Sequence, residues 1–336
     1  MTLSSIRGRA AAVLAVAALA TTACGASSTD GVGTDDSASS GPVTGVNFMV
    51  PNSAGSGYDK TARVAAKTLE DAGLVKGMQV TNIVGAGGTV GLQRLVNEKG
   101  NGGTLMLMGL GVVGAEYTNK AQATLQETTP IAKLVEEAEA IVVPKGSPYT
   151  DLASLMDAWK ADPAKVPVGG ASNPGGPDHL TPMLVADAIG LEPKKVNYVA
   201  YDGGGELLAG VLGNKVAFAA TGVSEVTEQA KAGEVTILAV TSEKRVEGVD
   251  APTLKEAGVD LTFANWRGIV AAPGLSDADT QKLVTLVGEM YASEEWKAAL
   301  TKNGWTDAYL GAEEFSSFLT AESDRVEGVL ADLGLV

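Results

Sequence analysis

Four short glycine-rich turns carry the residue types that could do chemistry in this chain. They span residues 51–59, 85–89, 169–176 and 201–205, and each lies between an apolar segment and an amphipathic segment. The first backbone NH groups of a helix are unpaired and carry a partial positive charge, which attracts carboxylates and phosphates. Glycine also lets a ligand approach the backbone closely. The turns therefore predict a site that binds a small anion through main-chain amides.

The residues expected to contact this anion come from the four turns and from two later positions. They are Asn52, Ser53, Ala54, Gly55, Gly57, Gly85, Ala86, Gly87, Gly88, Thr89, Ser172, Asn173, Gly175, Gly176, His179, Asp202, Gly203, Gly204, Thr221 and Arg267. The 53–59 segment could instead be a plain capped turn. Arg267 could grip a carboxylate with two NH donors or form an ion pair between domains. His179 could contact the ligand or only hydrogen-bond within its loop.

The sequence contains few residues that could support catalysis. His179 is the only histidine and Cys24 the only cysteine, so no cluster of these residues can bind a metal, and no second histidine is present to activate a serine. The 85–89 turn lacks the Gly-Lys-Ser/Thr ending of a phosphate-binding Walker loop. We therefore expect no catalytic residue, no metal and no cofactor, and the chain is predicted not to be an enzyme.

One motif favours a different function. Gly109, Gly111 and Gly114 fit the dinucleotide-binding fingerprint after an apolar segment, which would make the chain an exported NAD-dependent oxidoreductase. Two strand-helix units precede the motif, however, and Pro130 falls where the second strand of a nucleotide-binding unit should form. Close packing of a strand on a helix is the other interpretation of these glycines. A surface adhesin or scaffold is a third function that the sequence leaves open.

Acidic residues near the turns raise a question about the ligand. Asp178, Asp202 and Glu206 would repel an anion unless they were protonated, paired or used as helix caps. Helix capping is the simpler interpretation. The sharper hypothesis is a ligand that carries a proton or a metal ion.

The start of the chain predicts export. Residues 1–23 contain Arg7, Arg9 and an apolar run of a signal peptide, which is too short to span a membrane as a helix. Cys24 follows directly and is expected to be lipidated, with residues 24–43 forming a flexible tether rich in Gly, Ser, Thr and Asp. The formal net charge of −15 argues against nucleic acid and anionic membrane surfaces as partners.

The rest of the chain alternates between apolar and amphipathic segments. Strands, buried and parallel, are expected at 45–50, 78–84, 104–108, 139–144, 166–169, 196–200, 216–220, 236–241 and 267–272. Helices are expected at 59–72, 88–97, 151–160, 178–189, 204–213, 224–232, 276–291, 293–303 and 312–334, with no strand after about 272. This alternation predicts an α/β fold with ligands at the carboxyl ends of the strands.

Several ordered motifs resemble one family, the substrate-binding receptors of the tripartite tricarboxylate transporters, also called Bug receptors. The similar segments are Val50-Pro51 through Asp59, Gly85 to Gly91, Gly176 to Leu180, Leu238 to Ser242, Asn265 to Gly268 and Ala272 to Gly274. Many members have a basic residue where this chain has Asp202.

The resemblance implies a two-lobed, type II periplasmic-binding-protein fold, each lobe a mainly parallel sheet flanked by helices, with a helical C-terminal tail packed on lobe 1. Lobe 1 would contain residues 44–142 and 268–336, and lobe 2 residues 143–267. The implied function is extracytoplasmic capture of a citrate-like di- or tricarboxylate between the lobes and its delivery to membrane subunits of the transporter. The chain would be a monomer held at the cell membrane by its lipid.

Overall fold

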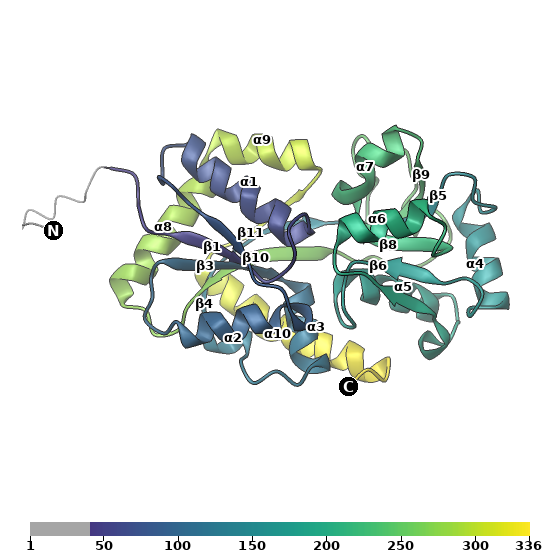
Figure 1. Ribbon diagram of the computed structural model, residues 1–336, viewed down its shortest axis with the longest axis horizontal. Coiled ribbons are helices and arrows are strands. Elements are labelled where there is room, and N and C mark those ends of the chain that lie inside the picture. The colour runs from purple at the N-terminus through teal and green to yellow at the C-terminus, as the bar shows by residue number, and fades with distance from the viewer. Residues whose placement is uncertain (1–40) are drawn as a thin grey trace, which may run out of the picture. The chain divides into compact units, whose positions relative to one another are not determined.

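Two β-sheets organise residues 41–336, which are the part of the chain that this computed structural model describes. The predicted signal peptide, Cys24 and nearly all of the predicted tether lie outside the described residues. Figure 1 shows one sheet with the elements of both chain ends and the other with the middle of the chain.

The first sheet has six strands in the order β11-β4-β10-β3-β1-β2 within the described residues. Their bounds are β1 (Asn47–Val50), β2 (Val80–Asn82), β3 (Thr104–Gly109), β4 (Thr129–Glu137), β10 (Asn265–Ala271) and β11 (Thr306–Leu310). β1 pairs in parallel with β2 and β3, whereas β10 runs antiparallel to its neighbours β3 and β4. β10 is buried along its whole length, so it forms a central strand that the end of the chain helps to cover.

The second sheet has five strands in the order β7-β6-β8-β5-β9 within residues 41–336. Their bounds are β5 (Glu139–Pro144), β6 (Val168–Gly170), β7 (Tyr198–Ala200), β8 (Phe218–Gly222) and β9 (Val235–Val240). β6 pairs in parallel with β7 and β8, and β5 pairs antiparallel with β8 and β9. The chain passes between the sheets at Ala138, which separates β4 from β5, and returns between β9 and β10.

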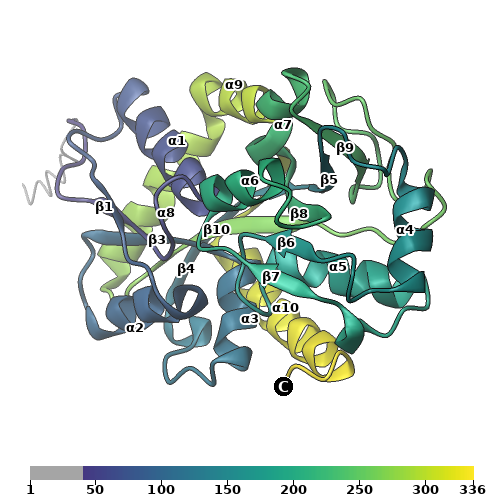
Figure 2. The same cartoon turned by 45° about the vertical axis from the view of Figure 1, so that its right-hand side comes forward.

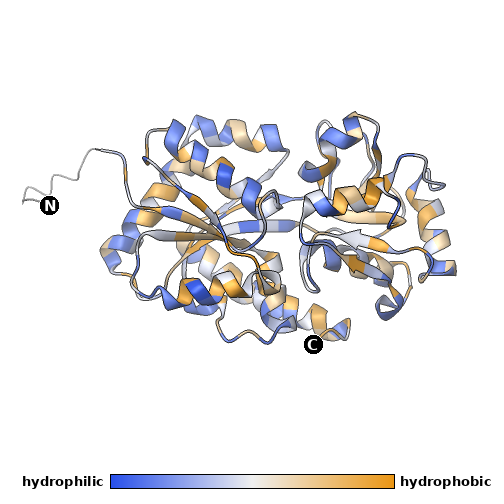
Figure 3. Ribbon diagram, viewed as in Figure 1, coloured by the Kyte–Doolittle hydropathy of each residue, from blue (hydrophilic) through white to orange (hydrophobic). Residues whose placement is uncertain are grey.

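Helices cover both faces of the first sheet, with α1, α8 and α9 on one face and α2, α3 and α10 on the other (Figure 1). Their bounds are α1 (Gly57–Asp71), α2 (Thr89–Asn97), α3 (Leu110–Thr118), α8 (Asp277–Ala292), α9 (Glu294–Asn303) and α10 (Ala312–Asp332). α1 buries Ala62, Ala65, Ala66 and Leu69, which the spacing of three and four residues places on one side of the helix. In Figure 3 the helix ribbons change between blue and orange along their length, as this pattern requires. The helical tail therefore packs on the first sheet, as predicted.

The second sheet separates two apolar layers because successive strand residues point to opposite faces. Ile141 and Val143 of β5 pack with one buried cluster, and Ala140 and Val142 pack with the other. The helices of these layers are α4 (Leu152–Ala161), α5 (Pro177–Ala188), α6 (Gly204–Leu212) and α7 (Val223–Lys231). Figure 2 turns this half of the molecule forward. Within residues 41–336 no helix combines the length and the apolar character needed to cross a membrane.

The mixed α/β architecture with two helix-flanked sheets confirms the predicted fold class, but three local predictions are wrong. A strand, β11, follows residue 272; it is a short, polar edge strand that pairs only with β4, so it lacks an apolar signal. β4 forms despite Pro130, because the proline lies at a break in the register with β10 and outside the residues that pair with β11, where a strand tolerates the missing NH. Residues 110–118 form the helix α3, which is buried on most sides and therefore shows no polar face to predict it.

The expected parallel pairing is found between β1 and its neighbours β2 and β3, and between β6 and its neighbours β7 and β8. The expected strands at 139–144, 236–241 and 267–272 belong to β5, β9 and β10, which pair antiparallel. An apolar run indicates that a strand is buried on both faces but does not indicate whether it pairs parallel or antiparallel with its neighbours. The pairing direction depends on where the chain crosses between the sheets. The predicted lobe limits stay a prediction.

Candidate ligand-binding site

The four glycine-rich turns converge on one cavity of about 320 Å³. The turns at 51–58 and 84–88 follow β1 and β2, and the segments at 171–178 and 201–204 follow β6 and β7 of the second sheet. All of them stand at the carboxyl ends of parallel strands, where α/β sheets place their ligands. Both sheets therefore contribute walls to the cavity.

Twelve of the predicted ligand-binding residues line this cavity, and eight do not. Those that line it are Asn52, Gly57, Gly85, Ala86, Gly87, Gly88, Ser172, Asn173, Gly176, Asp202, Gly204 and Arg267. The residues outside the lining are Ser53, Ala54, Gly55, Thr89, Gly175, His179, Gly203 and Thr221. Ligand contact by any of these twenty residues stays a prediction.

Further residues line the cavity that the sequence did not single out as ligand contacts. Most lie within or directly beside the predicted turns, and the others are Gly111, Thr118, Asn119, Glu225 and Asn265. Asn265 had a usable signal, because it lies two residues before Arg267 on a strand and must face the same side. Glu225 lies in the first turn of α7, after β8, so only the position of that helix brings it to the cavity.

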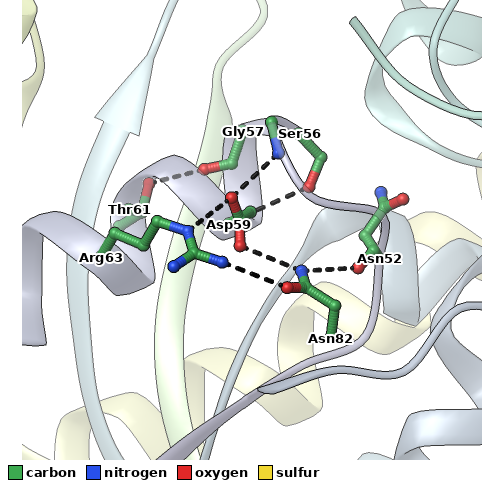
Figure 4. Close-up of polar contacts among 8 residues, drawn as sticks. Asn52, Ser56, Gly57, Asp59, Thr61, Arg63 and Asn82 are labelled. Carbon is green, nitrogen blue, oxygen red and sulfur yellow. Dashed lines mark hydrogen bonds and ion pairs between the residues drawn. The ribbon is translucent and has the colours of Figure 1, made fainter. Parts of the chain in front are cut away.

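The turn before α1 is held by its own side chains. Ser56 Oγ accepts a hydrogen bond from the NH of Asp59 at 3.3 Å, and the Asp59 carboxylate accepts one from the NH of Gly55 at 2.9 Å. Figure 4 shows the same carboxylate facing Arg63, which it pairs with at 2.9 Å, and the side-chain amide of Asn82 at 3.0 Å. Burial opposes ionisation, but these partners outweigh it and lower the pKa of Asp59. The capped-turn interpretation thus describes residues 53–55, whereas Asn52 and Gly57 reach the cavity.

The turn before α5 carries a histidine in the corresponding place. Nδ1 of His179 accepts a hydrogen bond from the NH of Gly175 at 3.2 Å, and the ring packs edge-on against Tyr198. Burial lowers the pKa of His179 to about 4, so the ring is neutral at pH 7 and can accept this bond. Of the two roles considered for His179, the structure therefore shows the hydrogen bond within its loop.

Asp178, the residue before His179, does not cap α5, whose N-cap is Gly176, and instead holds the loop that precedes the helix. Its carboxylate accepts hydrogen bonds from the NH of Ala171 at 2.8 Å and the hydroxyl of Ser172 at 3.0 Å. Burial nevertheless raises the pKa of Asp178 to about 6. The carboxyl group of Asp178, which lines the cavity, is thus hydrogen-bonded to residues of its own turn.

Glycine is required at the turn before α2. Gly87 and Gly88 have φ values of 64° and 104°, in the left-handed region that other residues avoid. A Cβ on Gly87 would also lie 2.7 Å from the Cβ of Ala115. Among the described residues, no side chain caps the N-terminus of α2 or of α6, whose first residue Gly204 lines the cavity. These helix starts keep their positive ends open toward the cavity.

Arg267 forms an ion pair, but with a residue of the neighbouring strand in the same sheet and not between domains as predicted, and it also lines the cavity. Its Nη1 lies 2.6 Å from Oε2 of Glu137, and both side chains are 2% exposed or less. The other oxygen of Glu137 accepts a hydrogen bond from the NH of Ser224 at 2.7 Å. Burial opposes ionisation of Glu137, yet Arg267 and Ser224 lower its pKa. Nη2 of Arg267 approaches Gly57 so closely that a Cβ there would lie 2.5 Å away.

Hydrogen bonds tie the cavity walls together across the two sheets. Ser53 Oγ donates to the carbonyl of Asp202 at 2.7 Å, and Thr118 Oγ1 donates to the carbonyl of Pro174 at 3.1 Å. Nζ of Lys60 donates to the carbonyl of Ser224 at 3.1 Å. Ser53, a predicted contact residue outside the lining, thus joins the two walls.

The glycines of the dinucleotide-like segment are explained by packing. A Cβ on Gly109 would lie 2.3 Å from the carbonyl oxygen of Trp266, and one on Gly114 would lie 2.0 Å from that of Gly175. Gly111, which lines the cavity, donates its NH to the hydroxyl of Tyr58 at 2.9 Å. Within residues 41–336 no group of three or more His, Cys, Asp or Glu residues is arranged to hold a metal.

Comparisons with known proteins agree with this geometry. The chain is 30% identical over 240 residues to a protein encoded in the TAR-I ttuE-ttuC' intergenic region of Agrobacterium vitis, a match covering 70% of this chain and 67% of that protein. The fold is similar to that of the periplasmic binding protein BugD, with a TM-score of 0.78, 23% identity, and coverage of 86% of this chain and 97% of BugD. It is also similar to MatC (Rpa3494) of Rhodopseudomonas palustris with bound malate, with a TM-score of 0.75, 22% identity, and coverage of 85% and 98%. The model of a family described as the tripartite tricarboxylate transporter family receptor matches residues 61–335, so the chain belongs to this receptor family.

Proposed function

We propose that the chain captures a di- or tricarboxylate, citrate-like in its number of carboxyl groups, and delivers it to the membrane subunits of a tripartite tricarboxylate transporter. The observation that carries this proposal is the convergence of the four glycine-rich turns on one cavity of about 320 Å³. That volume is at the small end of the usual range of ligand pockets, about 300 to 1,000 Å³. A small acid with two or three carboxyl groups suits a cavity of this size.

The cavity offers an anion two kinds of partner. The uncapped starts of α2 and α6 supply partial positive charge, and the glycines there let a carboxylate reach the backbone. Arg267 supplies the guanidinium, although Glu137 already neutralises it. Backbone dipoles therefore contribute most of the expected attraction, as the acidic composition of the chain requires. MatC of R. palustris, which shares this fold, is described with bound malate, and malate belongs to the proposed ligand class.

Ligand binding is tested by a thermal-shift screen of the full chain. The panel contains citrate, aconitate, tricarballylate, malate, succinate, adipate, glutamate, benzoate and NAD. We expect at least one di- or tricarboxylate to raise Tm, because a ligand that binds only the folded state stabilises it. No shift with any acid would contradict carboxylate capture.

The position of the site is tested by Gly57→Ala with Gly328→Ala as the matched control. Both glycines are helical, so alanine suits the backbone at both positions. A methyl group at residue 57 would lie 2.5 Å from Nη2 of Arg267 and 2.8 Å from Oε1 of Glu225, whereas nothing lies within 4 Å at residue 328. We expect Gly57→Ala to weaken carboxylate binding at least about tenfold and Gly328→Ala to leave it unchanged. Equal affinities in the two variants would show that the ligand does not bind in this cavity.

We also propose that the protein acts outside the cytoplasm and is anchored by a lipid on Cys24. This rests on the predicted signal segment before Cys24 and on BugD, which is described as a periplasmic binding protein. Radiolabelled palmitate should enter the protein in bacterial cells and should not enter Cys24→Ser. Label in the Cys24→Ser variant would contradict the anchor at this residue.

The oxidoreductase alternative is excluded by membership of a receptor family. Closure of two lobes around the ligand remains our proposal, with the lobe limits predicted from the sequence. Small-angle X-ray scattering with and without malate would detect it as a decrease in the radius of gyration.

A further inference from the structure

Three carboxyl groups line the cavity, and two of them, Asp202 and Glu225, lack both a cation and a backbone donor among the described residues; Asp202 is exposed, whereas Glu225 is half-buried. Glu225 accepts one long hydrogen bond, at 3.4 Å, from the hydroxyl of Thr221. No nitrogen of a Lys, Arg or His within residues 41–336 pairs with it inside 4.0 Å. Asp178 differs, because the NH of Ala171 and the hydroxyl of Ser172 bind its carboxylate. An ionised carboxylate with so few donors is costly in a half-buried place.

The carboxyl group of Glu225 lies where two helices begin. Its Oε1 would be 2.8 Å from a Cβ on Gly57, the first residue of α1, and its Oε2 would be 2.5 Å from a Cβ on Gly204, the first residue of α6. Both glycines line the cavity. A carboxylate of a ligand drawn to these helix starts would therefore meet Glu225 directly.

The charged groups around Glu225 come from several elements, and most are acidic. Facing it are Lys60 of α1, Glu137 of β4, Glu139 of β5, Asp178 of α5 and Arg267 of β10, with Glu228 on its own helix beside Lys60. Arg267 is already paired with Glu137, and Lys60 donates to the carbonyl of Ser224. Burial, with the charges of Asp178 and Glu137, raises the pKa of Glu225 to about 8 in spite of both cations.

We propose that Glu225 binds the ligand as a neutral carboxylic acid, donating its hydroxyl hydrogen to a ligand carboxylate, so that capture of the anion requires this proton. The inference rests on the proposed function, since it assumes a carboxylate ligand. A neutral acid supplies the donor that a ligand carboxylate needs, whereas an ionised Glu225 would repel it. Proton and ligand are then linked thermodynamically, and the bound acid stabilises the protonated form.

The binding test is calorimetry of the full chain with malate at pH 7 and pH 9. Both malate carboxyls are ionised throughout this range, and Asp178, with a pKa of about 6, is already ionised at its lower end. We expect Kd to rise about tenfold from pH 7 to pH 9, because Glu225 loses its proton near pH 8. Glu225→Gln keeps a donor at this place and loses the titration, so its Kd should be the same at both pH values. The control Glu228→Gln, three residues along the same helix and exposed, should keep the tenfold change.

Three results would overturn the inference. One is an equal Kd of the unmodified chain at pH 7 and 9, and another is a tenfold change that persists in Glu225→Gln. The third is tight binding of glutamate that Glu225→Gln abolishes, since Glu225 would then pair as a carboxylate with the ammonium group.

A measurement without ligand separates this inference from the proposed function. Carboxyl ¹³C resonances of the ligand-free chain, with Glu225→Gln to assign the signal, should show Glu225 titrating above pH 7. Titration near the ordinary value for Glu, about 4.3, together with normal malate binding would refute the inference alone. Titration near pH 8 without binding of any panel acid would instead refute carboxylate capture.

Discussion

The turns that precede α1 and α5 share a backbone but are held by different side chains. In both, an NH donates to the carbonyl three residues back, from Ser56 to Ser53 at 3.3 Å and from Gly176 to Asn173 at 2.9 Å. The third residue of each turn is a glycine with positive φ, 83° at Gly55 and 89° at Gly175, as a type II turn requires.

The NH of each of these glycines donates to the side chain four residues later. That residue is Asp59 in the first turn and His179 in the second. Four residues further along α1 stands Arg63, which pairs with Asp59 and is half exposed, whereas the corresponding residue of α5 is the buried Met183. A charged acceptor is thus used where a solvated cation can balance it, and a neutral ring is used where the surroundings are buried. The local turn therefore requires a side-chain acceptor at this position, and the surroundings of the turn decide whether that acceptor is charged.

The largest expected loss of stability distinguishes Arg267 from Arg63, the two arginines that form ion pairs near the start of α1. Arg267→Met leaves Glu137 buried without its cation, which should cost about 3 to 5 kcal/mol of unfolding free energy. Arg63→Met removes an exposed partner and should cost at most about 1 kcal/mol. Urea unfolding at pH 7 measures both values, and similar losses would show that burial does not separate the two pairs.

The next largest difference in stability is expected between alanine substitutions of the two glycines with positive φ, Gly55 and Gly175. Gly55→Ala meets nothing within 4 Å and should lose only the conformational strain, about 1 to 2 kcal/mol. At Gly175 the added Cβ would also lie 2.9 Å from the carbonyl oxygen of Gly114, so Gly175→Ala should lose about 2 to 4 kcal/mol. If Gly55→Ala were the more destabilised variant in urea, the close approach of the second turn to α3 would be wrong.

The acceptors should titrate in different pH windows. The pKa of His179 is about 4 in the folded chain and about 6.5 when unfolded, so the unfolded state binds more protons between these values and stability falls as the pH drops from 6.5 to 4. The loss attributable to His179 is at most about 3 kcal/mol. His179→Asn keeps an acceptor and removes this dependence. The lowered pKa of Asp59 gives a loss of the same sign that is confined to pH below its ordinary value, about 4. Urea unfolding from pH 3.5 to 7 compares the chain with His179→Asn and Asp59→Asn, and a coincident window for both residues would refute the assignment.

The smallest effect concerns the bonds that tie each turn to the opposite wall. Ser53→Ala removes the hydrogen bond to Asp202, and Thr118→Val removes the one to Pro174. Each should cost about 1 kcal/mol in urea unfolding, and the double variant should lose about the sum. A loss near zero in both variants would mean that water replaces these bonds equally well.

Local patterns in the sequence located most of the helices and strands and the glycine-rich turns that line the cavity. Apolar runs located β1, β3, β5 and most other strands, since burial on both faces leaves a local record in composition. Gly85, Gly87 and Gly88 predicted a turn with positive φ values, which the structure shows at these three glycines and also at Ala86. Eleven of the twelve predicted residues that line the cavity come from the glycine-rich turns, which follow parallel strands of two sheets, and the twelfth is Arg267 on β10.

What surrounds these turns depends on the tertiary structure. The partner of Arg267 is Glu137, on a strand 130 positions earlier whose existence Pro130 seemed to forbid. Glu225 reaches the cavity because α7 places it against the first residues of α1 and α6. The exposure of a side chain, the charge beside it and the direction of strand pairing depend on residues distant in the chain, and no local pattern of residue types records them.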